Sequence, residues 1–133
     1  VVAGFAGEET ADGHVYDLHD WRWDEKTLEL TGLRPRSVCM ASCLRDVAVI
    51  FGGEVDPSDR GHEGAGGFAN DLVLLDAKTG AHLRTLGAQA DWPEARGWAD
   101  AAAYDNTLYV FGGLTGDDEK PVRLNDLWKL ELS

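Results

Sequence analysis

Short runs of β-prone apolar residues alternate with turn-forming residues along the chain, and no segment keeps a helical period. This pattern predicts β-strands over residues 37–44, 47–53, 70–76 and 82–86. Residues 45–46 and 78–80 are typical of the turns that join antiparallel strands. The segment 54–69 is rich in glycine and charge, and it predicts a loop.

An internal repeat underlies this pattern. A shift of 60 residues places Arg36 on Arg96 and the Phe-Gly-Gly of 51–53 on that of 111–113. After the glycines the shift falls to 55, which places Asn-Asp-Leu 70–72 on Asn-Asp-Leu 125–127. The shift therefore changes by five residues between the glycines and the Asn-Asp pair. We expect the earlier copy to have a longer loop in this segment, because repeats tolerate insertions in loops.

A weaker third copy lies at the N-terminus. Val2-Ala3-Gly4 takes the place of residues 50–52, with Phe5 where the second glycine would stand. Residues 24–27 resemble the turn at 76–79.

The expected fold class is therefore all-β. Four antiparallel strands in roughly 50–60 residues form the unit of a propeller blade. The chain divides into a partial blade over 1–33, a full blade over 34–89 and a partial blade over 90–133. These would contribute three, four and three strands, or about two and a half blades.

The repeated motifs resemble the kelch family. The strand that ends in Phe-Gly-Gly is similar to its double-glycine signature, and Asn-Asp-Leu-x-x-Leu-Asp/Glu at 70–76 and 125–131 is similar to its third strand. The resemblance implies a closed ring of about six or seven blades. We therefore expect either that the chain belongs to a longer protein or that copies of it assemble into a ring. It also implies a binding module that presents rim loops, here 54–69, 87–95 and 114–124, to a protein or a small ligand.

A second resemblance concerns the segment 54–71. Gly-Gly-Glu at 52–54 and the run 62–71 are similar to the kelch specifier proteins, which direct the breakdown of glucosinolate-derived thiohydroximate sulfates. This likeness implies an iron(II)-dependent lyase with Glu54, Asp59 and His62 as metal ligands, although Ser58 stands at the expected aspartate position. Oxygen donors with one imidazole suit iron(II). The alternative is a solvated polar loop with a plain turn at 56–59.

Arg36, Arg96 and Trp98 are the candidate ligand-binding residues. Guanidinium groups at the rim could bind a small anionic ligand bidentately, as the specifier resemblance implies, and Trp98 could form a pocket wall. The alternative is structural: each arginine forms an ion pair with Asp71 or Asp126 of a nearby strand, and Trp98 belongs to the core between blades.

Net charge and cysteine usage limit the classes of partner and the compartment that we expect for the chain. The net charge of −12, from 24 acidic and 12 basic residues, disfavours nucleic acid. No apolar stretch reaches the roughly 20 residues of a membrane span. Cys39 and Cys43 lie four residues apart on one expected strand, about 13 Å from each other, too far for a disulfide. Free thiols indicate a reducing, cytoplasmic compartment.

Overall fold

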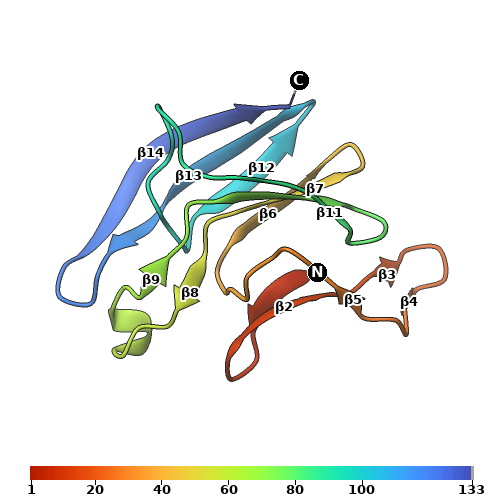
Figure 1. Ribbon diagram of the computed structural model, residues 1–133, viewed down its shortest axis with the longest axis horizontal. Helices are drawn as coiled ribbons and strands as arrows, with labels where there is room; N and C mark the ends of the chain where they lie inside the picture. The colour runs from red at the N-terminus through yellow and green to blue at the C-terminus, as the bar shows by residue number, and fades with distance from the viewer. Residues whose placement is uncertain (133) are drawn as a thin grey trace.

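The computed structural model describes residues 1–132, with the side chain of His62 excepted, and these residues form an all-β structure with one short 3₁₀ turn (Figure 1). Every strand pair is antiparallel, and no sheet of the described residues closes on itself. The strands are β1 (Val2–Phe5), β2 (Glu9–Gly13), β3 (Tyr16–Asp17), β4 (Arg22–Trp23), β5 (Leu28–Glu29), β6 (Met40–Leu44), β7 (Val47–Phe51), β8 (Glu54–Asp56), β9 (Gly67–Phe68), β10 (Leu72–Asp76), β11 (His82–Leu86), β12 (Asp100–Tyr104), β13 (Thr107–Gly116) and β14 (Pro121–Glu131); the 3₁₀ turn η1 spans Gly61–Glu63.

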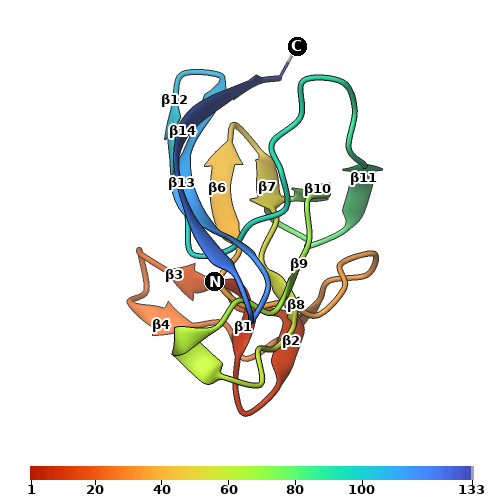
Figure 2. The same cartoon turned by 90° about the vertical axis from the view of Figure 1, so that its left-hand side faces the viewer.

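Three main sheets follow one another along the chain, with the orders β1-β2-β5, β11-β10-β7-β6 and β12-β13-β14. They hold three, four and three strands, in agreement with the strand count expected from the sequence. Two small hairpins, β3-β4 and β8-β9, extend from them. In Figure 2 the third sheet stands beside the four-stranded sheet, and β1 and β2 lie below both.

The backbone repeats with the same shift of 60 residues as the sequence. Gly52 and Gly112 have φ of 62° and 64°, and Gly53 and Gly113 have φ of 100° and 105°. A Cβ on Gly53 would lie 2.7 Å from the carbonyl oxygen of Ser37. Glycine is therefore required here both by its left-handed backbone and by a close backbone neighbour.

The N-terminal copy is shifted by one residue from the alignment made on the sequence. The amide of Gly4 donates to the carbonyl of Arg36 at 2.9 Å, as the amide of Gly53 does to that of Arg96 at 2.8 Å. Gly4 therefore matches Gly53, and Ala3, with φ of 52°, takes the place of the first glycine. The alignment that placed Phe5 at the position of the second glycine was wrong. Ala3 takes the left-handed position of the first glycine, which residues other than glycine rarely occupy.

Two apolar layers hold the sheets together. The first lies between β1-β2-β5 and the four-stranded sheet, and its buried members are Leu30, Leu33, Ile50, Val73 and Leu75. The second lies between the four-stranded sheet and β12-β13-β14, and its buried members are Met40, Leu44, Val49, Phe51, Leu72, Leu108 and Val110. Each sheet thus packs face to face on the next.

Three local expectations differ from the structure. The strand expected over 37–44 begins at Met40, because Val38 has φ of 45° and interrupts it. The loop expected over 54–69 contains the β8-β9 hairpin and η1. The loop expected over 114–124 is mostly strand, because β13 runs to Gly116 and β14 begins at Pro121. The described residues include no helix of the length and apolarity that crossing a membrane requires.

Candidate functional site

Two buried arginines occupy equivalent places in neighbouring sheets. Arg36 is 1% exposed and donates to both carboxylate oxygens of Asp71, at 2.6 and 3.0 Å. Arg96 is fully buried and donates to both oxygens of Asp126, at 2.6 and 2.9 Å. These are the ion pairs that the sequence analysis gave as the alternative to ligand contacts, and anion binding by the two arginines stays a prediction.

Each arginine also binds the backbone around the paired glycines. Arg36 donates to the carbonyls of Gly52 and Arg34, and Arg96 donates in the same way to those of Gly112 and Glu94, at 2.9–3.1 Å. One side chain therefore joins the segment before the first strand, the end of the second and the start of the third. A bidentate guanidinium suits this task because its donors are fixed in one plane.

The carboxylate of Asp126 also accepts a hydrogen bond from the indole of Trp128, at 2.7 Å. The Arg96 hydrogen bonds, followed by that from Trp128, lower the pKa of Asp126 from 3.8 to about 2. The acid is thus ionised throughout the physiological range and balances the buried guanidinium.

At the end of the sheets beyond the paired glycines, two segments from successive repeats form what we call the loop face: residues 54–68 and 115–120 (Figure 1). The hydroxyl of Ser58 donates to the carboxylate of Asp118, whose other oxygen accepts the Asp59 amide at 3.2 Å. The Arg60 guanidinium donates to the carbonyl of Asp118 at 2.7 Å. The two segments are therefore fastened to each other across the repeat boundary.

The proposed metal ligands lie on this loop face. Glu54 is half-buried, and its Oε1 accepts the amide of Gly66 at 3.2 Å, while Asp59 is exposed. The side chain of His62 lies outside the described part of the structure. Within the described part, no three His, Cys, Asp or Glu side chains are grouped closely enough to hold a metal ion. Iron(II) binding by Glu54, Asp59 and His62 stays a prediction.

An open hollow of about 500 Å³ lies between the two segments of the loop face. Its polar lining consists mainly of carboxylates, from Asp56, Asp59, Asp117 and Asp118. The rest of the wall is formed by three glycines and by Pro57, Ala65, Phe68, Ala95 and Thr115. Clustered carboxylates at a concave surface give it a negative potential, so the hollow favours cationic groups. The acids of 54–69 were expected from the sequence, whereas Asp117 and Asp118 were missed because they become neighbours of that segment only when the repeats pack.

Trp98 lines neither this hollow nor the apolar pocket described next. Trp98 is half-exposed, its φ is 60°, and its amide donates to the carbonyl of Val38 at 3.1 Å. Val38 is the counterpart of Trp98 under the 60-residue shift, and both residues have a left-handed backbone. The hydrogen bond between them therefore joins two consecutive repeats.

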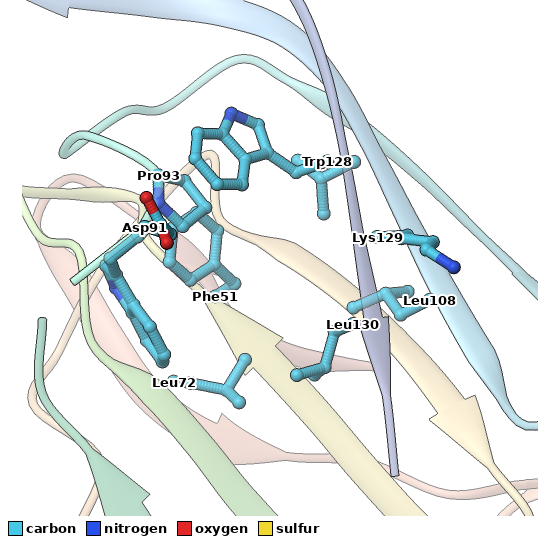
Figure 3. A pocket seen from close by; sticks show the side chains of 10 residues that line it. Phe51, Leu72, Asp91, Pro93, Leu108, Trp128, Lys129 and Leu130 are labelled. Atoms are coloured by element: carbon cyan, nitrogen blue, oxygen red, sulfur yellow. The ribbon is translucent and has the colours of Figure 1, made fainter. Parts of the chain in front are cut away.

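An apolar pocket of about 140 Å³ opens between the second and third sheets (Figure 3). Phe51 and Leu72 line one side, and Leu108, Trp128 and Leu130 line the other. Trp92, which stacks edge-on against Phe51 at 6.4 Å, donates its indole proton to the carbonyl of Asn70 at 2.6 Å. This pocket was not predicted from the sequence, in which the tryptophans at 92 and 128 were the available signal.

No protein-family model matches the chain.

Proposed function

We propose that the chain is a segment of a kelch-type β-propeller that serves as a binding module, with the loop face as its recognition surface and a protein with a basic segment as its partner. Each main sheet corresponds to a blade, and the paired glycines and Asn-Asp motifs recur in the kelch pattern. The successive face-to-face packing of antiparallel sheets supports this architecture.

The hollow on the loop face carries the proposal. Its carboxylates come from two repeats and are held in place by the Ser58, Asp59 and Arg60 hydrogen bonds to Asp118. A preordered surface of this kind binds without the entropy cost of ordering loops. A basic segment of a partner complements both the hollow and the net charge of −12.

The test uses a fluorescently labelled oligolysine peptide as the probe. Its affinity for the chain is compared with that for the double variant Asp56→Asn/Asp59→Asn, which removes two carboxylates that line the hollow. We expect binding to weaken about fivefold, because each exposed charge pair contributes roughly 0.5 kcal/mol. Raising the salt concentration should reduce this difference.

The matched control is Glu25→Gln/Asp46→Asn, which makes the same change in net charge at exposed positions in turns away from the loop face. Equal loss of affinity in both double variants would mean that the peptide senses only overall charge, and the proposed recognition surface would be rejected.

A further inference from the structure

Three aromatic rings line the apolar pocket between the second and third sheets, and they belong to Phe51, Trp92 and Trp128 (Figure 3). Phe51 and Trp92 meet edge to face, with their ring planes at 67° and their centroids 6.4 Å apart. Trp128 lies on β14, on the other side of the pocket from Phe51. The face of an aromatic ring carries partial negative charge and attracts a cation within about 6 Å of the ring centre. A wall built of such rings therefore favours a positively charged group.

The two indole N–H groups of the pocket are already bound to the framework. Trp92 donates to the carbonyl of Asn70 at 2.6 Å, and Trp128 donates to the carboxylate of Asp126 at 2.7 Å. These hydrogen bonds fix the orientation of both rings before any ligand enters, so little ordering entropy is lost on binding. The indoles therefore offer the pocket ring surface and no free donor.

Asp91 places a carboxylate beside the rings, and it is the one acid among the described residues that line the pocket. Its carboxylate forms no hydrogen bond or ion pair within the part of the chain that the structure describes. Lys129 also lines the pocket, but its ammonium group is paired with Glu131 at 2.7 Å. In Figure 3 the Lys129 side chain is directed away from Phe51 and Asp91. The unpaired charge that an occupant meets is therefore negative.

The volume of the pocket, about 140 Å³, limits the size of the occupant. An apolar cavity of about 150 Å³ holds one molecule of benzene. Drug-sized ligands occupy pockets of roughly 300–1,000 Å³. The pocket therefore admits one compact group of a ligand, while the rest of that ligand stays outside.

The scarcity of hydrogen-bond acceptors decides which cationic group fits. A primary ammonium group has three N–H donors, and burying them beside Asp91 alone would leave some of them without an acceptor. A trimethylammonium group carries the same charge but has no N–H to satisfy. Its methyl groups can contact the rings and the leucines of the pocket, and aromatic rings are the usual recognition surface for such groups.

The interface between the first and second sheets shows that packing of the repeat does not require these rings. The places of the three aromatic residues are taken there by Val2, Gly32 and Val73. An apolar layer joins the sheets at both interfaces. The pocket at the first interface measures about 80 Å³, and its described lining contains no Phe, Tyr or Trp. The rings are therefore a feature of the second interface alone.

We infer that the apolar pocket binds the trimethylammonium group of a ligand, with the rings of Phe51, Trp92 and Trp128 against the methyl groups and Asp91 beside the charge. The site is separate from the loop face, and it does not depend on what the loop face binds.

The test compares three probes of similar size. Choline carries the trimethylammonium group, its neutral carbon analogue has a tert-butyl group in the same place, and ethanolamine has the unmethylated ammonium group. Binding is followed by NMR through the indole N–H signals of Trp92 and Trp128, with those of Trp21 and Trp23 on the β3-β4 hairpin as internal controls. We expect choline to shift only the first two signals and to bind about tenfold more tightly than either other probe.

The variant Asp91→Asn tests the role of the carboxylate. Asparagine has the same shape and tolerates the left-handed φ of 56° at this position. We expect choline to bind about fivefold more weakly, while the neutral analogue keeps its affinity. The matched control is Asp105→Asn, which removes an exposed acid with φ of 53° outside the pocket and should leave choline binding unchanged.

Three results would overturn the inference. Equal affinities of choline and its neutral analogue would show a purely apolar pocket, and equal affinities of choline and ethanolamine would show a general ammonium site. Failure of choline to shift the Trp92 and Trp128 signals would exclude this pocket as its site. These comparisons use the unaltered chain, so they hold even if a variant does not fold.

A peptide with one trimethyl-lysine tests the other source of the same group. Tighter binding than choline would assign the group to a methylated side chain of a protein, and weaker binding would assign it to a free quaternary amine. The unmodified lysine peptide is the control and should bind at least about tenfold more weakly than the methylated one. Choline affinity should be unchanged in Asp56→Asn/Asp59→Asn, so failure here is distinguishable from failure of the proposed function.

Discussion

The guanidinium of Arg96 donates to both carboxylate oxygens of Asp126, and the Arg36–Asp71 pair repeats this geometry one sheet earlier. Both arginines are almost wholly excluded from solvent, while their carboxylate partners are partly exposed. Each pair fastens the start of one repeat to its own third strand. The ion pairs therefore belong to the framework that supports the loop face.

Replacing Arg96 with methionine should lower the free energy of unfolding by about 3 kcal/mol, because the change removes one partner of a buried ion pair. Urea denaturation at neutral pH measures this. The control is Arg34→Met, which breaks the pair with Asp56 that is exposed on both sides and should cost less than about 1 kcal/mol. Equal costs for the two variants would contradict the structural role of Arg96.

Acid should weaken the fold through Asp126. Its pKa is 3.8 in the unfolded reference and about 2 in the folded chain. The folded state therefore binds fewer protons in this window, so the stabilisation is complete above the unfolded value and is lost as pH falls through the folded value. We expect Asp126→Asn to flatten the decline of unfolding free energy in this window.

Urea titrations on both sides of that window measure the effect. Glu25→Gln, which removes an exposed carboxylate, is the control and should keep the wild-type slope. If Asp126→Asn also kept that slope, Asp126 would not be the source of this pH dependence.

Gly53→Ala should destabilise the chain by at least about 1–2 kcal/mol, the cost of a left-handed conformation for a residue with a Cβ. The new Cβ would also lie 2.7 Å from the Ser37 carbonyl oxygen, which adds to the cost. Gly87→Ala provides the comparison, since a Cβ there meets open space, and its effect should stay within about 0.5 kcal/mol. Thermal unfolding followed by circular dichroism measures both.

Ser58→Ala should loosen the loop face without unfolding the sheets. The substitution removes the hydroxyl that donates to Asp118 and accepts the Arg60 amide at 3.0 Å. Hydrogen exchange at the amides of Asp59 and Arg60 should quicken about fivefold, the equivalent of roughly 1 kcal/mol for a lost hydrogen bond. The amides of β7 should keep their rates. Unchanged exchange at Asp59 and Arg60 would show that Asp118 does not hold the segment.

The sequence predicted the all-β class and the number of strands in each main sheet, because β-prone runs and turns recur with a nearly fixed shift. It misplaced the first copy by one residue because Ala3 adopts a left-handed φ of 52°, which residues other than glycine rarely do. It also missed that the strands extend into 114–116 and 121–124, since the Gly-Asp composition there is that of a loop. Pairing between β13 and β14 supplies hydrogen bonds that outweigh the local preference.

The candidate site was less accessible to prediction from the sequence. The acids of 54–69 could be found by composition, but their contact with Asp118 joins residues 60 positions apart and exists only after the sheets pack. For Arg36 and Arg96, the sequence left both ligand contact and ion pairing open, and the recurrence of the arginine in both copies slightly favoured ion pairing. The burial of both arginines and their contacts with Asp71 and Asp126 are properties of the folded chain.

Arg36 holds both ends of the long segment between β7 and β10, through the carbonyl of Gly52 at one end and the carboxylate of Asp71 at the other. The stem of that segment is therefore fixed whatever lies between its ends. A foreign peptide grafted between β8 and β9 would be flanked by the same two contacts of Arg36. The molecule could therefore serve as a scaffold that displays new binding segments without redesign of its sheets.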